Sequence, residues 1–411
     1  MGPSSTADEQ RRAGMIEAHI DSLLRQRLET LERAGKDGTK VVGYLPGGYV
    51  PEELIYASGA IPLCLATGGD GRVADEALSL VPSVICAFAR AQIAQLMRQT
   101  DPFYSAIDLL VVPSTCQHMK KIGDVWEFQE GRQVFKLGVP YEHDKAFELE
   151  YYRDRLCSLK ERLETLTGNH ITDGGLIEAA ETYNHLRRLL RTLGQTRRNA
   201  HQGNEAINTL EFARLDHASF FADPVAMTAS LEEICADFPS SADPSAGIPD
   251  PSLPRRPRLL LVGPNLAVGD YDLLKMVVDA GADIVVEDIF EGMRDCRQVV
   301  DLSGHQDCME ALARAYLIDK RPAAFMRGSL PLRLEHLHRL AREYAVSGVI
   351  WYQLLCCEFY DEESCYFQMM LQERGIPMLV VESDYHALDS GQLRTRLAAF
   401  IETIQGGPID A

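Results

Sequence analysis

The chain has 411 residues, of which 46% are hydrophobic and 25% charged, and this globular composition excludes a disordered or fibrous protein. Asp and Glu outnumber Lys and Arg by 60 to 41, so the net charge of -19 would repel the phosphates of nucleic acid and of an anionic membrane. We therefore expect no nucleic acid and no membrane among its partners, and the length predicts two or three domains.

Targeting signals are missing from the sequence. No apolar run approaches the roughly 20 residues that cross a bilayer, and the first residues lack the apolar core of a signal peptide. We therefore expect a cytoplasmic protein. In that reducing compartment the ten cysteines are expected to be buried thiols and metal or catalytic ligands rather than disulfides.

The first half of the chain begins with a helix and continues with alternating elements. Residues 1–38 predict a long amphipathic helix, because apolar residues recur at helical spacing and glycines follow. In residues 39–145 short apolar runs alternate with helical stretches, including a helix over residues 83–99, as in a parallel sheet with crossover helices. The strand-like runs are KVVGYL, IPLCLA, IDLLVVP and VFKLGVP.

The second half repeats this alternation after a helical section. Residues 146–237 contain no convincing strand and carry the period of packed helices, and residues 238–257 contain six prolines and predict a linker. In residues 258–411 the strand-like runs RLLLVG, ADIVVED, GVIWYQLL and PMLVVES alternate with helices, one of them from Glu362. We predict an α/β protein with two doubly wound parallel-sheet domains and a helical connecting section.

Three cysteines fall at comparable places in these predicted domains. Cys116 follows the run IDLLVVP, Cys357 follows GVIWYQLL, and Cys86 lies in the first turn of a predicted helix. Ligands bind at the carboxyl ends of strands in open sheets, and the N–H groups of a following helix stabilise a thiolate. Soft thiolates suit a 4Fe-4S cluster whose fourth iron is open. Since the spacing is not a CxxC motif, mononuclear zinc, a catalytic thiol and a site without metal are alternatives.

Several segments together resemble the 2-hydroxyacyl-CoA dehydratase and benzoyl-CoA reductase superfamily. VVGYLPGGYVPEELIYASGAIPL is similar to the family's opening, in which a GY-x-P turn leads into a P-x-E-L-I helix and an A-x-G-x-x-P turn. DLLVVPSTCQHMKK resembles its strand and thiolate turn. WYQLLCCEFYDEES and GIPMLVVESDY resemble its C-terminal Q-L-x-x-C-[DE] and G-I-P-x-L-x-x-E-x-D blocks, and ALARAYL also has its place there. The match spans most of both predicted α/β domains.

The resemblance implies that Cys86, Cys116 and Cys357 are the ligands of an iron–sulfur cluster. In the family each such subunit binds a 4Fe-4S cluster, pairs with a second similar subunit and receives electrons from a separate ATP-hydrolysing 4Fe-4S activator protein. The reactions are dehydration of a 2-hydroxyacyl-CoA and dearomatising reduction of benzoyl-CoA. A related branch is a homodimeric reductase with a double-cubane cluster and no assigned CoA substrate. We therefore expect an activator, a homodimer or related second subunit, and a small-molecule substrate as partners.

Further cysteines bear on the choice between these branches. The chain has more thiols than one cubane uses, namely Cys296, Cys308, Cys356 and Cys365. The segments VIWYQLL and ESDY resemble the corresponding segments of the double-cubane proteins. Adjacent side chains in a strand point to opposite faces, however, so Cys356 can belong to the core. We expect an ATP-dependent, two-component low-potential reductase with a double-cubane 8Fe-9S cluster. The alternatives are a single-cubane subunit of a 2-hydroxyacyl-CoA dehydratase or benzoyl-CoA reductase, and a non-catalytic cluster-binding protein.

Other candidates each have a functional and a purely structural interpretation. The resemblance to the family's P-x-E-L-I helix implies that Glu53 is a base or proton shuttle. The structural interpretation is a carboxylate that stabilises the start of a helix. His118 and Lys120 follow Cys116 and can deliver protons or screen an anionic cluster, whereas Arg90, four residues after Cys86, can bond a cluster sulfide; all three can instead be ordinary solvated residues. Gly47-Gly48 stands where members acting on hydroxyacyl-CoA often have Ser, which weakens the dehydratase interpretation. No G-K-[ST] follows the glycines, so we do not expect the chain to be an ATPase itself.

Overall fold

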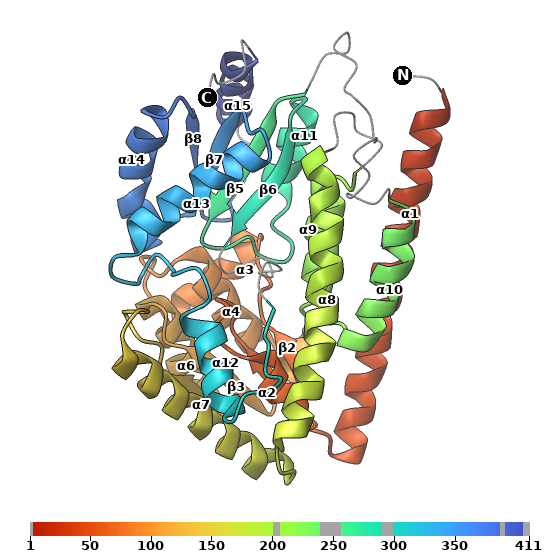
Figure 1. Ribbon diagram of the computed structural model, residues 1–411, viewed down its shortest axis with the longest axis vertical. Helices are drawn as coiled ribbons and strands as arrows, with labels where there is room; N and C mark the ends of the chain where they lie inside the picture. Colours follow the sequence, from red (N-terminus) through yellow and green to blue (C-terminus); the bar gives the residue numbers. More distant parts are fainter. Residues whose placement is uncertain (1–2, 200–205, 239–255, 290–298, 387–390, 406–411) are drawn as a thin grey trace.

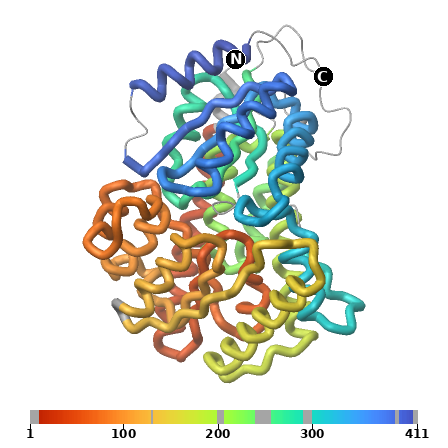
Figure 2. The backbone as a smooth tube through the Cα atoms, turned by 90° about the vertical axis from the view of Figure 1, so that its left-hand side faces the viewer, coloured from red at the N-terminus to blue at the C-terminus, as the bar shows by residue number. Residues whose placement is uncertain are grey.

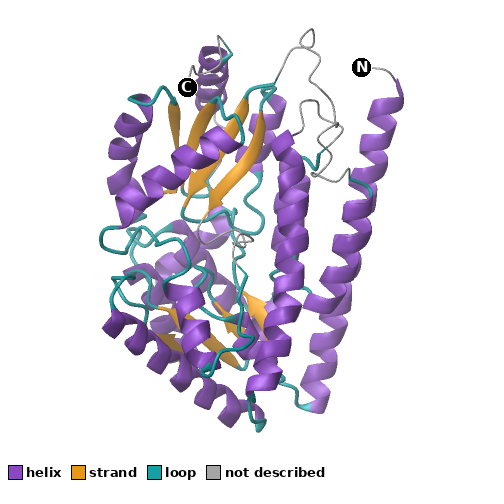
Figure 3. Cartoon of the chain, in the orientation of Figure 1, coloured by secondary structure: helices purple, strands orange, loops and turns teal. Residues whose placement is uncertain are grey.

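Two parallel sheets with flanking helices form the framework of the protein. The computed structural model describes residues 3–199, 206–238, 256–289, 299–386 and 391–405. Within these ranges the strands form two four-stranded sheets that are parallel throughout and packed between helices (Figure 3). The prediction of an α/β fold with two parallel sheets is therefore confirmed.

The first sheet has the order β2-β1-β3-β4. The chain leaves β1 to one side to form β2 and then returns to the other side of β1 to form β3, so the strand order reverses between β1 and β3. Such a reversal opens a crevice at the carboxyl ends of the strands. The elements are β1 (Val41–Tyr44), α2 (Glu52–Ala57), β2 (Ile61–Cys64), α3 (Gly71–Asp75), a 3-10 turn (Glu76–Ser79), α4 (Ala87–Arg98), α5 (Pro102–Ser105), β3 (Leu109–Pro113), α6 (Gln117–Glu130) and β4 (Gln133–Leu137).

The second sheet repeats this topology with the order β6-β5-β7-β8, so its reversal lies between β5 and β7. All seven residues of β7 are buried, which explains why its sequence is continuously apolar apart from one Gln. The elements are β5 (Arg258–Gly263), α11 (Asp272–Asp279), β6 (Asp283–Ile289), α12 (Cys308–Leu317), α13 (Ser329–Glu343), β7 (Gly348–Leu354), α14 (Glu358–Gln372), β8 (Met378–Ser383) and α15 (Gly391–Ile404).

Long helices run alongside both sheets (Figure 1). Helix α8 packs against α2 of the first sheet region and against β6 and α12 of the second. Its Arg197 forms a buried ion pair with Glu287 of β6. The helical connection predicted from the sequence thus bridges the two sheets rather than standing apart from them. These helices are α1 (Pro3–Asp37), α7 (Ala146–Thr167), α8 (Asp173–Asn199), α9 (Thr209–Ala218) and α10 (Pro224–Ala236).

The loops after β2 and β5 join the two sheet regions directly. The backbone N–H of Gly68 donates to the carbonyl of Val268 at 2.9 Å, and the N–H of Val268 donates to Ala66 at 2.8 Å. A Cβ atom at Gly69 would lie 2.7 Å from the backbone of Gly269, so glycine permits this close approach. Figure 2 shows the two sheet regions stacked one above the other.

Two predicted helix boundaries are wrong, and the short helices α3 and α5 and the longer helix α13 were not predicted. Helix α4 begins at Ala87 instead of residue 83, because a turn closed by Ile85 N–H to Pro82 O precedes it. Helix α14 begins at Glu358, before the predicted Glu362, and acidic residues in its first turn favour that start. Helix α13 follows Gly328, which adopts the left-handed backbone conformation. The sequence pattern did not predict this helix.

None of the helices in the described ranges combines the length and the apolar character of a membrane span.

Candidate metal centre

A pocket of about 650 Å³, partly open to solvent, lies where the carboxyl ends of the two sheets meet. Its wall is built from the residues that follow β3, β5 and β7 and from the first turns of α4, α6 and α14. Both strand-order reversals therefore contribute to one site, as open α/β sheets lead one to expect.

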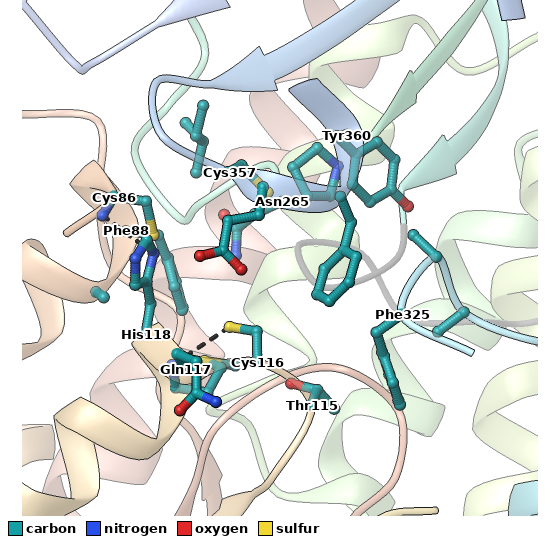
Figure 4. A pocket seen from close by; sticks show the side chains of 18 residues that line it. Cys86, Phe88, Thr115, Cys116, Gln117, His118, Asn265, Phe325, Cys357 and Tyr360 are labelled. Carbon is teal, nitrogen blue, oxygen red and sulfur yellow. Dashed lines mark hydrogen bonds between the residues drawn. The ribbon is translucent and has the colours of Figure 1, made fainter. Parts of the chain in front are cut away.

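Three cysteines line this pocket, each from a different element. Cys86 caps the N-terminus of α4, Cys116 caps α6 and Cys357 caps α14. Figure 4 shows Cys86, Cys116 and Cys357 around the same space. The structure thus brings together the three cysteines that the sequence singled out as ligands. Cys86 differs from the other two cysteines in its distance from a strand along the chain. Helix α3 and a 3-10 turn lie between the end of β2 and Cys86.

The helix N-termini make this corner of the protein favourable for negative charge. The three helices have 12, 14 and 15 residues, and a cysteine occupies the N-cap position of each, beside the N–H groups of the first turn. The Sγ atom of Cys116 accepts a hydrogen bond from the N–H of Met119 at 3.4 Å. Such positions lower the pKa of a thiol in general and stabilise thiolates and anionic groups.

The pocket contains no preassembled site for a single metal ion. Over the described ranges, no three His, Cys, Asp or Glu side chains gather tightly enough to hold a metal ion. Tetrahedral zinc, one of the alternatives considered from the sequence, requires ligands at about 2.0–2.3 Å from one ion.

The wall between the cysteines is largely apolar. Phe88, Phe325 and Phe359 contribute aromatic rings, and Met119 and Ala323 contribute smaller apolar surfaces. In Figure 4, Phe88 lies beside Cys86, whereas Phe325 lies on the far side of the pocket. An apolar wall strengthens electrostatic interactions inside the pocket and limits the access of water.

His118 is the one predicted acid–base residue that lies in the wall. Its Nδ1 accepts a hydrogen bond from the backbone N–H of Cys86 at 3.3 Å. Burial lowers the pKa of His118, and this effect outweighs the opposing influence of the Glu358 carboxylate. The imidazole is therefore neutral near pH 7 and carries its proton on Nε2, because Nδ1 serves as an acceptor.

Two polar residues of the wall were not singled out from the sequence. Thr115 directly precedes Cys116 and is only 1% exposed, and its hydroxyl has no hydrogen-bond partner within the described part of the chain. Asn265 follows β5 and is equally buried. Both come just after a strand, so the rule that placed Cys116 and Cys357 at the sheet edge would also have identified them.

Three of the additional cysteines considered as cluster ligands do not line the pocket: Cys308, Cys356 and Cys365. Cys356 is half-buried in the turn after β7 with φ of +66°, so the strand alternation considered for it does not apply. Cys365 is exposed on α14, and Cys308 is buried at the start of α12, which packs against α7. Cys296 lies outside the described residues.

Glu53 also lies away from the pocket, in a buried ion pair between three elements. Its side chain is fully buried and accepts hydrogen bonds from Arg187 of α8 at 2.6 Å and from the Tyr316 hydroxyl of α12 at 2.7 Å. Arg187 also donates to Tyr316 at 3.0 Å. This environment compensates a buried charge and ties the two sheet regions together. It gives no support to a base at the pocket.

The two predicted basic cofactor contacts are placed differently as well. Arg90 is buried and forms an ion pair with Asp75, whose other oxygen lies 2.8 Å from Nε2 of His386. Lys120 is half-buried in the second turn of α6. Neither residue lines the pocket, and the guanidinium of Arg90 is engaged by a carboxylate.

Comparison with known proteins agrees with the resemblance seen in the sequence. The family model described as 2-hydroxyglutaryl-CoA dehydratase, D-component, matches residues 48–404, a range that includes all three pocket cysteines and every strand of the two sheets except β1. The YjiM protein of Escherichia coli is 26% identical over 87% of this chain and 89% of that protein. The (R)-phenyllactyl-CoA dehydratase beta subunit of Clostridium sporogenes is 23% identical, with 89% and 92% covered. One of the benzoyl-CoA reductase subunits of Thauera aromatica is 32% identical over 37% of this chain and 38% of its own length.

Proposed function

Because the chain belongs to the 2-hydroxyglutaryl-CoA dehydratase D-component family, within the predicted superfamily of 2-hydroxyacyl-CoA dehydratases and benzoyl-CoA reductases, we propose that it is the iron–sulfur component of a two-component dehydratase or reductase. The observation that carries the proposal is the convergence of Cys86, Cys116 and Cys357 on one pocket at three helix N-termini. In this proposal the three thiolates hold a 4Fe-4S cluster. Such a cluster supplies low-potential electrons at an iron that the protein leaves open.

The remaining residues of the pocket fit that role. The helix N-termini stabilise the negative charge of the ligands, and the wall formed by Phe88, Phe325 and Phe359 limits water at a site that handles strongly reducing electrons. His118 retains a proton on Nε2 and can donate a hydrogen bond from this nitrogen to a bound substrate. The likeness to relatives named as acting on phenyllactyl-CoA and benzoyl-CoA supports an acyl-CoA as the substrate.

The proposed system contains further proteins. Relatives named as beta subunits support a second subunit, either a related chain or another copy of this one. Within the described residues the glycine turns lack the lysine of a phosphate-binding loop, so ATP hydrolysis in this proposal belongs to a separate iron–sulfur activator.

One cluster per chain is the form that the geometry favours. Three thiols reach the pocket, whereas Cys308 and Cys365 do not. A double-cubane reductase is the second candidate, because the half-buried Cys356 adjoins Cys357 and offers a further thiol beside the pocket.

The test is iron and acid-labile sulfide per chain after strictly anaerobic purification. We expect about four irons for a single cubane, whereas about eight would identify the double cubane. Cys86→Ala, Cys116→Ala and Cys357→Ala should each lose most of the iron, while Cys308→Ala and Cys365→Ala serve as matched controls and should retain it. A wild-type chain without iron, even after reconstitution in vitro, would refute the proposal.

A further inference from the structure

Thr115 occupies an unusual position in the turn between β3 and α6. Its side chain lines the pocket and is 1% exposed, and its hydroxyl has no hydrogen-bond partner among the described residues. The backbone N–H of the same residue is already used, because it donates to the carbonyl of Pro113 at 2.9 Å. The hydroxyl is therefore a buried donor that faces an apolar wall.

Packing alone does not explain a hydroxyl at this place. Valine has the same shape as threonine and would fit a wall of Met119 and Phe325 without burying an unpaired polar group. Buried hydroxyls in native proteins almost always have a partner, and one without a partner is destabilising. An acceptor is therefore expected on whatever fills the pocket.

The position of Thr115 in the chain indicates which acceptor this is. Thr115 directly precedes Cys116, one of the three proposed ligands, so its hydroxyl lies in the same turn as the cluster site. Figure 4 shows the two side chains next to each other on the same side of the pocket, and the Sγ atom of Cys116 is not a hydrogen-bond partner of the hydroxyl in this structure. We propose that the Thr115 hydroxyl donates a hydrogen bond to an inorganic sulfide of the cluster beside Cys116. This inference rests on the proposed function.

Such a hydrogen bond would act on the reduction potential. Reduction adds negative charge to the sulfurs, so a donor aimed at them stabilises the reduced form more than the oxidised form. Thr115 is therefore a positioning residue that raises the potential of the site, in the way that groups around the ligands tune metal centres generally.

The experiment compares Thr115→Val with Thr115→Ser by anaerobic redox titration without substrate. Thr115→Val should lower the equilibrium constant of one-electron reduction about tenfold, which is about 59 mV, whereas Thr115→Ser retains a hydroxyl and should match the wild type. Iron content and thermal unfolding are measured for both variants, so that loss of the cluster or of the fold is recognised separately.

Three results would overturn the inference. The first is a Thr115→Val potential equal to that of the wild type at equal iron content, which leaves the proposed function intact. The second is an equal shift in Thr115→Ser, because a retained hydroxyl would then have no effect. The third is an unchanged potential with a raised KM, since the hydroxyl would then bind a substrate oxygen instead of sulfur. A wild-type chain without iron removes this inference together with the proposed function.

Discussion

The buried ion pair of Glu53 and Arg187 leads to a quantitative prediction about stability. The carboxylate of Glu53 is fully buried, the side chain of Arg187 is 7% exposed, and the two are 2.6 Å apart. Glu53→Gln preserves the size of the side chain but leaves the guanidinium with a neutral neighbour. Removing one partner of a buried pair costs about 3–5 kcal/mol, because the other charge stays buried without compensation. We expect Glu53→Gln to lower the free energy of unfolding by about that amount.

The assay is equilibrium unfolding in urea, followed by the fluorescence of two tryptophans. Trp126 of α6 and Trp351 of β7 are both buried and lie in different sheet regions, so Trp126→Phe and Trp351→Phe allow each region to be monitored separately. We expect both signals to shift together, because α8 carries Arg187 and packs against both regions.

A double variant supplies the control. Glu53→Gln combined with Arg187→Met removes both charges and should recover most of the lost stability, because no unpaired charge is left. A loss below about 1 kcal/mol in Glu53→Gln, or a double variant no more stable than the single one, would refute the reasoning. Full stability together with complete loss of turnover would restore Glu53 as a candidate base.

Two further predictions concern the junction between the sheet regions. Burial raises the pKa of Asp270 from 3.8 to about 7, although the Tyr352 hydroxyl donates a hydrogen bond to its carboxylate. The raised pKa contributes stability to the folded protein that is fully present below about pH 3.8. This stability is lost as the pH rises through about 7. Asp270→Asn should flatten the decline of the urea midpoint between about pH 4 and 7, and an unchanged slope would contradict this assignment. Gly69→Ala should destabilise the protein more than Gly131→Ala, since both glycines have positive φ but only a Cβ at Gly69 meets other backbone, at 2.7 Å. Equal unfolding midpoints for the two glycine variants would show that the close approach at Gly69 is unimportant.

Local sequence was sufficient to predict the class of the fold. The buried runs that became β1, β3, β5 and β7 are short, apolar and rich in β-branched residues, and parallel strands of this kind need helices on both faces. The same pattern placed Cys116 and Cys357 at strand ends, since the carboxyl edge follows directly from where an apolar run stops. Boundaries were less certain, because the start of α4 depends on a turn at Pro82 that hydrophobic periodicity does not register.

The roles of Glu53 and Arg90 could not be predicted from neighbouring residues. The partner of Glu53, Arg187, lies 134 residues further along the chain, and that of Arg90, Asp75, sits on a short helix that the sequence pattern did not reveal. A carboxylate at a helix start is compatible with catalysis and with an ion pair alike. Only the packing of α2 against α8 decides between them.

The sequence by itself therefore determined the two α/β regions, the family and the identity of the three cysteines, because these depend on residues close together in the chain and on motifs in a fixed order. Tertiary structure alone decided that Cys86, Cys116 and Cys357 share one pocket, that Cys308 and Cys365 do not, and that Thr115 buries a hydroxyl there. The physical reason is that a pocket is made by elements from both sheets. Which of their side chains meet depends on how the sheets stack, and the local pattern of apolar and polar residues does not contain that information.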